Sequence, residues 1–514
     1  MRAAFASKRI PFVVSPSVSM ALTVEREVRT TEKLAETVSQ EGRAFLAKKV
    51  PQLHPFQVEG ALFLARTQRA LLLDEMGLGK TIQSIAAACL LRKFAGIQSC
   101  LIIAPKSVLK NWATEIFKFI GEQCVIISGT DGKREELYRR KEFFKAVTLE
   151  SFRKDYPNTG KSELIIVDEV HKCRDITTLS SRVLRSVESP FLFGLSGTAI
   201  EKSLDDLYGI LRVLRAGRLE TPLEFAATHL ACNDFGKVVY TAHPEFFYIR
   251  HSDRIRRRLK SEVDNSIPAL NVVSVALPLT PIQDELAIPM LSELEELCER
   301  LRERYETNDF IRRRWLINRI VELSNSSELI DPSTHGSSKL EWLRDFLQAT
   351  CTCPENKVVV FTRWTRCLKM ICTLCDFLNL KYVKLTGDTK TDERLEVVHQ
   401  FTNDLQTLVF ISTDAGGVGI NLQVARIVVN LEPAWNPSVD SQRIQRLHRL
   451  GQTREVTAYL PQTILDAKFT LETHGKKQWI ADQIDGARFR SMQDLPPAWG
   501  ELLSIIRHIR ETVA

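Results

Sequence analysis

The sequence contains no uninterrupted apolar run long enough to cross a bilayer, so no membrane span is expected. Its 11 cysteines are scattered and odd in number, which argues against a disulfide framework and favours a reducing compartment. Short-period repeats and low-complexity tracts are also lacking. What is present is a chain of 514 residues with 44% hydrophobic content, enough for more than one globular core.

The charge balance is only mildly basic. The 70 Lys and Arg residues exceed the 63 Asp and Glu residues by 7, which is compatible with a polyanionic partner but does not require one. Three basic clusters can either bind such a partner or form solvated helix faces, and we favour the second interpretation slightly for any single cluster. They are Arg254, Arg256, Arg257 and Arg258; Arg312, Arg313 and Arg314; and Arg139, Arg140 and Lys141.

Two further features have competing interpretations. One set of cysteines could form a zinc site, but its second pair falls in the apolar stretch 368–378, so we expect a core role and no structural metal. The set is Cys351, Cys353, Cys372 and Cys375. The first 24 residues contain no acid, as in a mitochondrial transit segment, yet Pro11 and Pro16 interrupt them. We interpret residues 1–50 as a mobile arm followed by a polar helix from about residue 30 to residue 49.

A glycine-bearing loop lies between an apolar strand, predicted over 71–73, and a helix that opens at Thr81. Backbone N–H groups and a helix N-terminus suit phosphate binding, Lys80 supplies a positive charge, and Thr81 offers a hydroxyl to Mg²⁺. Asp74 stands where the usual pattern has its first glycine, so an ordinary loop is an alternative when this segment is considered alone.

A second motif is the acidic pair Asp168 and Glu169, which follows four apolar residues predicted to form a buried strand over 164–167. The end of a strand is where an α/β sheet places its ligand chemistry. Asp168 can hold the Mg²⁺ that the glycine-bearing, phosphate-binding loop (P-loop) before Thr81 requires, and Glu169 can then polarise an attacking water. A solvated acidic loop is the alternative.

Short β-branched, apolar runs alternate with helix-like stretches in two series. The first series is 101–104, 125–127, 164–167 and 191–195, and the second is 358–361, 382–385, 408–411, 427–431 and 457–460. This alternation predicts an α/β fold with two parallel sheets, each covered by helices on both faces. Between the series, Leu291, Leu294, Leu297, Leu301 and Tyr305 recur at helical spacing and predict a long amphipathic helix.

These patterns divide the chain into five parts. We expect an arm and helix over 1–50, a nucleotide-binding lobe over 51–245, a helical insertion and linker over 246–335, a second lobe over 336–480 and a C-terminal brace or tail over 481–514. The turn-forming segment 331–338 is the boundary before the second lobe.

In the second lobe, the segment 412–422 leaves a strand and turns through three glycines, as a close backbone approach requires. Further on, Arg446 and Arg449 are three residues apart and share one face of a predicted helix. Two guanidiniums on one face can bind a phosphate and offset the charge that develops in phosphoryl transfer. A basic surface helix with ordinary salt bridges is the alternative.

Taken in order, the motifs resemble those of the Swi/Snf-type DNA translocases of helicase superfamily two. The resemblance runs from about residue 51 to residue 480, and its most specific segments are Gly-Ile-Asn-Leu, Trp-Asn-Pro and Arg-Leu-His-Arg-Leu-Gly-Gln. The motifs lie at 54–57, 74–81, 104–107 with 111–112, 168–171, 195–198, 357–362, 385–387 with 393–394, 412–422, 434–437 and 442–452. The resemblance implies two RecA-like lobes, use of ATP and Mg²⁺, and movement along double-stranded DNA that remodels protein–DNA complexes or DNA structures.

The resemblance also implies a role for each matching position. The implied catalytic residues are Lys80, Asp168, Glu169, Arg446 and Arg449, the last two as arginine fingers from the second lobe. The implied nucleotide-binding residues are Gln57, Asp74, Gly77, Gly79, Lys80, Thr81 and Gln442, with Thr81 and Asp168 as Mg²⁺ ligands. Ser196 and Thr198 would couple hydrolysis to motion. Lys106, Ser107, Thr362, Ser412, Thr413 and Trp435 would contact a nucleic-acid strand.

Alternative functions remain at this point. A strand-separating helicase acting on RNA or forked DNA would share the ATP site, although Gln452 favours the translocase because RNA helicases of this superfamily typically have arginine there. A non-catalytic DNA-binding scaffold would not need the charged residues of the ATP site, all of which are intact: Lys80, Asp168, Glu169, Arg446 and Arg449. A metabolite kinase leaves the second lobe unexplained. The compact chain favours a prokaryotic or viral source and a cytoplasmic location, or a nuclear one in a eukaryote.

Overall fold

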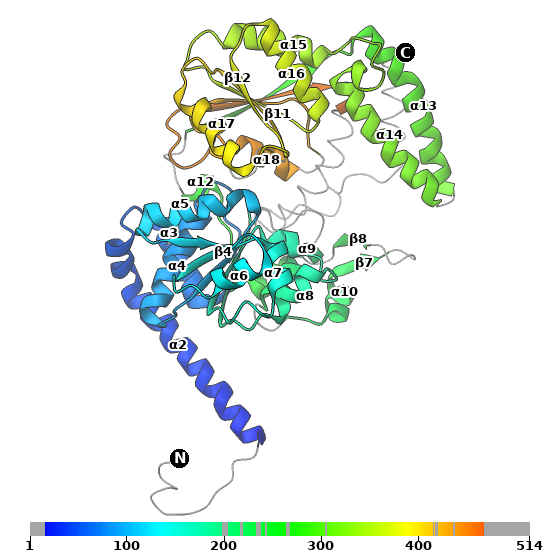
Figure 1. The fold of residues 1–514 in the computed structure, drawn as a ribbon. Helices are drawn as coiled ribbons and strands as arrows, with labels where there is room; N and C mark the ends of the chain where they lie inside the picture. Colours follow the sequence, from blue (N-terminus) through cyan, green and yellow to red (C-terminus); the bar gives the residue numbers. More distant parts are fainter. Residues whose placement is uncertain are drawn as a thin grey trace, which may run out of the picture.

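The chain folds into two lobes stacked one above the other, with a helical hairpin beside the upper lobe (Figure 1). The computed structural model describes residues 16–466, apart from 198–203, 216–218, 233–237, 242–243, 264–267, 304–305, 415, 417–419 and 435–436. Each lobe is built on a parallel sheet with an apolar core on either face. The predicted α/β class, with two RecA-like lobes and a helical insertion, is confirmed.

The described residues of the first lobe form a seven-stranded parallel sheet in the order β3-β4-β2-β5-β6-β1-β9. Neighbouring residues of a strand face opposite cores: Leu72 and Ile102 pack on one face, Leu71 and Leu101 on the other. The strands are β1 Arg69–Leu72, β2 Cys100–Ile103, β3 Cys124–Ile126, β4 Phe144–Val147, β5 Leu164–Asp168, β6 Phe191–Leu195 and β9 Ile255–Arg256. Because all are parallel, the loops after β1, β2 and β5 meet at one edge.

Helices cover this sheet and extend from it. They are α2 Pro16–Lys49, α3 Pro55–Thr67, α4 Lys80–Phe94, α5 Leu109–Ile120, α6 Asp131–Tyr138, α7 Leu149–Asp155, α8 Leu179–Ser186, α9 Leu204–Leu214, α10 Pro222–His229, α11 Pro244–His251 and α12 Lys260–Val263, with short 3-10 turns η1 Lys106–Val108 and η2 Val170–Cys173. An antiparallel hairpin joins β7 Leu230–Cys232 to β8 Val238–Thr241. The helix expected from about residue 30 ends at Lys49 as predicted but begins at Pro16; the rest of the predicted arm, 1–15, lies outside the described residues.

Two strands of the seven-stranded sheet, β4 and β9, were not predicted, nor was the β7–β8 hairpin. Strand β4 is only four residues long and includes the half-buried Lys145, which breaks the apolar run. Strand β9 lies inside the first arginine cluster, where no apolar pattern exists. Main-chain carbonyls of Arg254, Arg256 and Arg258 accept hydrogen bonds from the N–H groups of 71, 73 and 75 at 2.7–2.9 Å. The favoured interpretation of this cluster as a solvated helix face is therefore wrong.

The described residues of the second lobe form a six-stranded parallel sheet in the order β10-β15-β14-β11-β13-β12. The strands are β10 Leu270–Leu277, β11 Val358–Thr362, β12 Tyr382–Leu385, β13 Val409–Thr413, β14 Ile427–Asn430 and β15 Val456–Thr463. The helices are α13 Pro281–Glu303, α14 Thr307–Asn325, α15 Ser338–Thr350, α16 Thr365–Phe377, α17 Thr391–Asn403 and α18 Pro437–Ile444, with the 3-10 turn η3 Ser327–Leu329. The edge strand β10 comes from the segment assigned to the insertion. Cys372 and Cys375 pack in the core of this lobe, as the core interpretation predicts.

The helical hairpin of α13 and α14 forms only part of the segment 246–335 that was predicted as a helical insertion and linker. Leu291, Leu294 and Leu297 are buried in its core, which confirms the amphipathic helix. The last position of its pattern, Tyr305, and the brace or tail expected over 481–514 lie outside the described residues.

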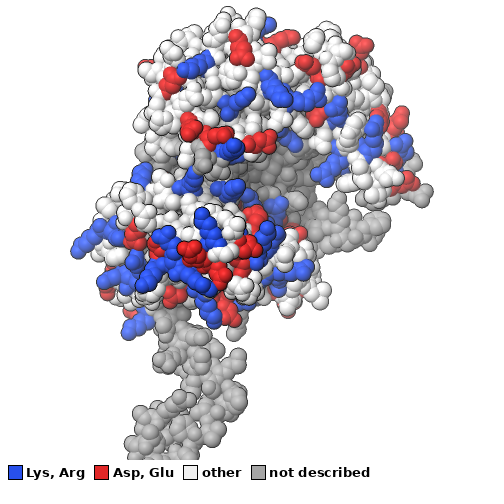
Figure 2. Space-filling view, in the orientation of Figure 1, with Lys and Arg blue, Asp and Glu red and all other residues white. Residues whose placement is uncertain are grey.

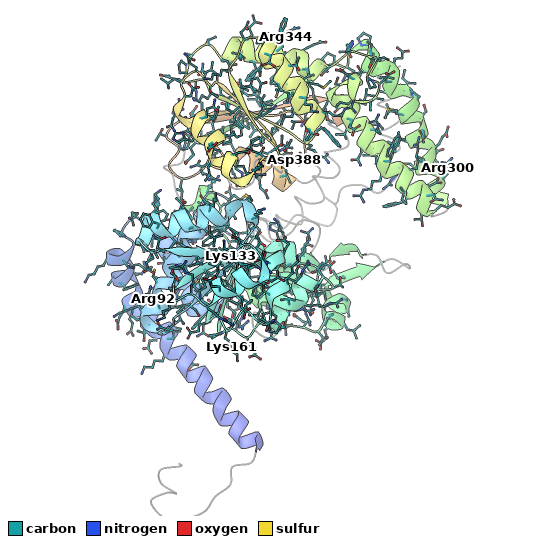
Figure 3. All side chains as sticks on the ribbon, in the orientation of Figure 1. Arg92, Lys133, Lys161, Arg300, Arg344 and Asp388 are labelled. Atoms are coloured by element: carbon teal, nitrogen blue, oxygen red, sulfur yellow. The ribbon has the colours of Figure 1, made fainter. Side chains whose placement is uncertain are left out.

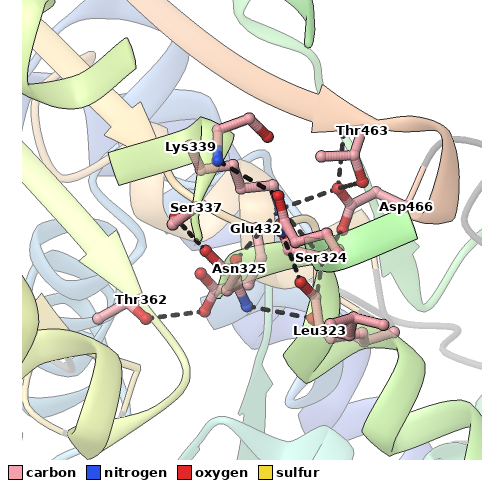
Figure 4. Close-up of polar contacts among 12 residues, drawn as sticks. Leu323, Ser324, Asn325, Ser337, Lys339, Thr362, Glu432, Thr463 and Asp466 are labelled. Atoms are coloured by element: carbon pink, nitrogen blue, oxygen red, sulfur yellow. Dashed lines mark hydrogen bonds and ion pairs between the residues drawn. The ribbon is translucent and has the colours of Figure 1, made fainter. Parts of the chain in front are cut away.

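A buried polar cluster fixes the hairpin to the second lobe (Figure 4). The Lys339 ammonium lies 2.8 Å from the Asp466 carboxylate and donates to Asn325 Oδ1 at 3.1 Å. Because Lys339 belongs to α15 and Asn325 ends α14, these contacts join the last turn of the hairpin to the first helix of the lobe. No helix in the described part of the chain is both long and apolar enough to span a membrane.

Candidate active site

The loop after β1 approaches its neighbours closely through two glycines. Gly77 and Gly79 have φ angles of +91° and +73°, a region that glycine adopts without strain. A Cβ on Gly77 would lie 3.0 Å from the Cβ of Arg449 in the other lobe, and one on Gly79 would lie 2.5 Å from Gln57 Nε2. Helix α4 begins directly at Lys80, so the loop presents a helix N-terminus.

The side chains of Lys80 and Asp74 have different partners in this loop. The Lys80 ammonium donates to the Asp74 carbonyl at 2.7 Å, and burial lowers its pKa while Glu169 and Asp74 oppose the shift. The Asp74 carboxylate is fully buried and accepts hydrogen bonds from Arg258 at 2.5 and 3.0 Å and from Gln83 at 3.0 Å. The Asp74 side chain is therefore bound by Arg258 and Gln83, and it does not make the nucleotide contact that the resemblance implied.

The acidic pair follows β5 at the same edge of the sheet. Trp112 Nε1 donates to Asp168 Oδ2 at 2.9 Å, and the Glu169 N–H donates to Asp168 Oδ1 at 3.0 Å. Burial, followed by the charge of Glu169, raises the pKa of Asp168 to about 6. Burial also raises the pKa of Glu169, but the contact from His171 and the positive charges nearby outweigh it, so that pKa lies below its ordinary value.

A buried histidine joins the acidic pair to the segment predicted to couple hydrolysis to motion. His171 Nδ1 lies 3.1 Å from Glu169 Oε2 and 2.9 Å from Ser196 Oγ. Ser196 itself is 1% exposed and directly follows β6. Thr198, the other residue predicted for this role, lies outside the described residues.

Both predicted arginine fingers lie against the first lobe. They lie in the turn that follows α18. In this turn, Arg449 Nε donates to the Gln445 carbonyl at 3.0 Å. Burial lowers the pKa of Arg446 while Glu169 opposes the shift. Burial and the neighbouring Arg446 lower the pKa of Arg449 to about 10, so that the Arg449 guanidinium stays charged at neutral pH.

A cavity of about 490 Å³ between the lobes brings these groups together. Of the residues predicted for catalysis and nucleotide binding, ten line it: Gln57, Gly77, Gly79, Lys80, Thr81, Asp168, Glu169, Gln442, Arg446 and Arg449. Asp74 is the one that does not. The cavity is also lined by Trp112, Glu115, Lys118 and Asn421, for which no role was predicted. Trp112 belongs to a motif of the resemblance, but the pattern gave no sign that its indole holds Asp168.

Comparison with known protein families agrees with this arrangement. A model described as the SNF2-related domain matches residues 56–287, and one described as the helicase conserved C-terminal domain matches residues 338–451. The chain belongs to the SNF2-related ATPases of helicase superfamily two. The resemblance drawn from the sequence motifs is confirmed.

Several proteins resemble this SNF2-related chain. The ISWI chromatin-remodeling complex ATPase ISW1 of Saccharomyces cerevisiae is 27% identical over 443 residues, covering 79% of this chain and 38% of that protein. The human SWI/SNF-related matrix-associated actin-dependent regulator of chromatin subfamily A member 1 is 25% identical, covering 89% and 46%. An uncharacterized ATP-dependent helicase of Mycoplasma pneumoniae is 26% identical, covering 80% and 40%. The chain thus spans less than half the length of these relatives.

Among solved structures, the Sulfolobus solfataricus SWI2/SNF2 ATPase core in complex with dsDNA is 23% identical. It matches 85% of this chain and 94% of that one with a TM-score of 0.42.

A second and larger cavity, of about 800 Å³, also lies between the lobes of this SNF2-related chain. Lys106 and Ser107, predicted to contact nucleic acid, line it from the first lobe. Its other basic side chains are Lys172, Lys390 and Arg394, and its acidic ones include Glu150 and Asp388. Asp388 projects from the side of the second lobe that faces the first (Figure 3). Elsewhere on the face shown in Figure 2, basic and acidic side chains are interspersed over both lobes.

The remaining residues predicted to contact nucleic acid are placed differently. Thr362 and Ser412 are fully buried, and Thr413 is 4% exposed. Thr362 donates to Glu432 Oε1 at 3.0 Å, and Ser412 Oγ donates to the Thr413 carbonyl at 2.9 Å. Their hydroxyls are therefore not available to a phosphate in this conformation. Trp435 lies outside the described residues.

Proposed function

We propose that this chain hydrolyses ATP, with Mg²⁺ as cofactor, to move along double-stranded DNA and to remodel the protein–DNA complexes or DNA structures that it meets. The observation that carries the proposal is the cavity of about 490 Å³, lined by a P-loop and an acidic pair from one lobe and by two arginines from the other. Because neither lobe completes this set alone, hydrolysis can be tied to relative motion of the lobes.

The acidic pair suits a divalent cation. Asp168 and Glu169 are adjacent half-buried carboxylates, and desolvation together with their repulsion raises the pKa of Asp168 to about 6. A doubly charged cation offsets that repulsion, and carboxylate and hydroxyl oxygens are ligands that Mg²⁺ prefers. Asp168 and Thr81 would hold it, and it would neutralise charge on the phosphates.

The other residues of the cavity have roles that follow from their chemistry. Lys80 and the N-terminus of α4 would bind the phosphate oxygens. Glu169 would orient the attacking water, since the contact from His171 at 3.1 Å holds its carboxylate in place. Arg446 and Arg449 would stabilise the negative charge that spreads over the transferred phosphoryl group, and removal of such an arginine costs about 10³- to 10⁵-fold in turnover.

The larger cavity is the proposed path of a DNA strand. Lys106, Lys390 and Arg394 carry charge suited to phosphates but not to reading bases, which predicts binding that is independent of sequence and sensitive to salt. Asp168 and Glu169 line both cavities, so the acidic pair lies between the proposed ATP and DNA sites. A movement of either lobe during hydrolysis would therefore change both sites together.

The targets of this movement are proposed from the relatives. One of them is named as a chromatin-remodeling complex ATPase and another as a regulator of chromatin, which supports protein–DNA complexes as the substrate class. Displacement of a bound protein from a labelled duplex, with ATP and with a non-hydrolysable analogue, measures this directly. Release that does not depend on hydrolysis contradicts the remodelling part of the proposal.

The central experiment is ATP turnover measured with duplex DNA, single-stranded DNA, RNA or no nucleic acid. We expect the strongest stimulation by duplex DNA and a loss of at least about 10³-fold in Arg449→Ala. Arg344→Ala is the matched control, because Arg344 is an exposed arginine of the second lobe that pairs with the adjacent Asp345. Normal turnover in Arg449→Ala refutes the arginine-finger assignment. Stronger stimulation by RNA, or unwinding of a labelled duplex, favours a strand-separating helicase.

A further inference from the structure

At the smaller cavity, which Gln445 also lines, four residues connect the lobes in a compact set that we call the interlobe clasp: Glu75, Lys260, Gln445 and His448. Gln445 Nε2 of the second lobe donates to Glu75 Oε1 of the P-loop at 3.1 Å. The Lys260 N–H donates to Glu75 Oε2 at 2.8 Å, and its ammonium donates to the His448 carbonyl at 2.7 Å. Glu75 thus receives groups from both sides of the cleft.

The clasp holds both flanks of one proposed arginine finger. His448 directly precedes Arg449 in the chain. Gln445 lies four residues before Arg449, and its carbonyl accepts from Arg449 Nε at 3.0 Å. Arg449 also approaches the P-loop closely, because its Cβ is 3.0 Å from the position that a Cβ on Gly77 would take. A shift of the segment 445–449 would therefore change the position of Arg449 relative to the P-loop. The orientation of the Arg449 guanidinium therefore depends on the contacts within the interlobe clasp as well as on its own hydrogen bond to Gln445.

Each clasp side chain has a defined hydrogen-bonding role. His448 Nε2 lies 2.8 Å from the Pro268 carbonyl, and because a carbonyl only accepts, Nε2 carries the hydrogen. Nδ1 is then an acceptor that faces the Lys260 ammonium at 3.5 Å. Lys260 is 7% exposed. The charged groups that face it are Glu75, which lies 3.7 Å away, together with Arg449 and Lys80.

We propose that Lys260 and Gln445 are positioning residues that hold Arg449 over the P-loop, Gln445 through Glu75 and Lys260 through the His448 carbonyl, and that they set the rate of ATP turnover rather than the affinity for ATP. This inference rests on the proposed ATPase function and its arginine fingers. A misplacement of about 1 Å in a reacting group costs on the order of 10²-fold in rate. Because Arg449 acts on charge that develops during the reaction, loss of the clasp lowers kcat and leaves the KM for ATP nearly unchanged.

The test compares kcat and KM for ATP, at saturating duplex DNA, in Lys260→Met and Gln445→Leu. We expect kcat to fall about 10- to 100-fold in Lys260→Met and less in Gln445→Leu, with KM within about 3-fold of wild type. Lys260→Arg keeps a donor with a permanent charge and restores most of the turnover. Lys161→Met is the matched control, since Lys161 is an exposed lysine of the first lobe that pairs with the exposed Glu188.

A double-mutant cycle shows whether Lys260 acts through the finger. Arg449→Lys weakens the finger without abolishing its charge, and Lys260→Met added to it is expected to cause little further loss. Losses that multiply independently overturn the inference, and so does a normal kcat in Lys260→Met while Arg449→Ala is inactive. A fully active Arg449→Ala protein refutes the arginine-finger assignment on which this inference rests, whereas absence of DNA-stimulated ATP turnover in the wild-type chain overturns the proposed function. Circular dichroism and thermal unfolding of each variant separate these outcomes from a failure to fold.

Discussion

The buried ion pair between Asp74 and Arg258 provides a prediction whose size follows from the structure. The Asp74 side chain is 0% exposed and the Arg258 side chain 13% exposed. Two hydrogen bonds join them, Nη2 to Oδ2 at 2.5 Å and Nε to Oδ1 at 3.0 Å. With Arg258→Met, the carboxylate loses both of these bonds and keeps the bond from the neutral Gln83 amide at 3.0 Å. Its charge is then left largely unpaired in the interior.

Removing one partner of a buried ion pair typically costs about 3–5 kcal/mol, because the remaining charge stays desolvated. For a lobe of this size, each kcal/mol lowers Tm by about 2–4 °C, so Arg258→Met is expected to lower the first unfolding transition by about 6–20 °C. Differential scanning calorimetry of the full chain measures this shift. The double variant Asp74→Leu with Arg258→Met removes both charges and is expected to recover most of the loss.

Arg254→Met is the matched control. Arg254 belongs to the same arginine cluster, but its side chain is 32% exposed and pairs with the adjacent, exposed Asp253. Its loss is expected to change stability by less than about 1 kcal/mol. An Arg258→Met protein that unfolds within about 2 °C of wild type would refute the argument that this buried pair stabilises the first lobe.

Two more predictions concern the active site. Trp112→Phe keeps an aromatic ring but removes the hydrogen bond to Asp168, so about 10- to 100-fold more Mg²⁺ is expected to be required for half-maximal ATP turnover, measured by Mg²⁺ titration. The second concerns pH: burial lowers the pKa of Lys260 to about 8 from 10.5, so its ammonium is present below pH 8 and is lost as the pH rises through that value. Turnover is expected to fall between about pH 7 and pH 9 in wild type but not in Lys260→Arg.

Each of these has its own control. Trp342→Phe removes an indole that stacks on Phe346 in the second lobe, and its Mg²⁺ requirement is expected to stay at the wild-type value. For Lys260, stability and turnover change in opposite directions. Its folded-state pKa is depressed, so between about pH 8 and about pH 10.4 the unfolded chain binds more protons, and this group's contribution to folding stability rises with pH. If turnover and folding stability both fall as the pH rises above about 8, the assignment of the turnover loss to Lys260 is contradicted.

Local patterns in the sequence predicted the parts of the site that depend on neighbours in the chain. Strands 164–167 and 191–195 appear as β5 and β6, because a strand buried on both faces must be apolar throughout. Gly77 and Gly79 mark the turn, because other residues are strained at their φ angles. The order of these segments was enough to identify the family, and the acidic pair and both arginines line the cavity expected for them.

Only the tertiary structure decided which distant groups meet. Asp74 was expected to face the nucleotide, but it binds Arg258, 184 residues further along the chain. Thr362 and Ser412 were expected to face DNA, but both are buried. Lys260 gave no signal as a clasp residue because its partners come from other segments. The sequence by itself determined the strands, the turns and the identity of the charged residues, since these follow from local conformation and burial. The pairing of charges and the contacts across the cleft depend on how two separately built sheets pack, which no local pattern encodes.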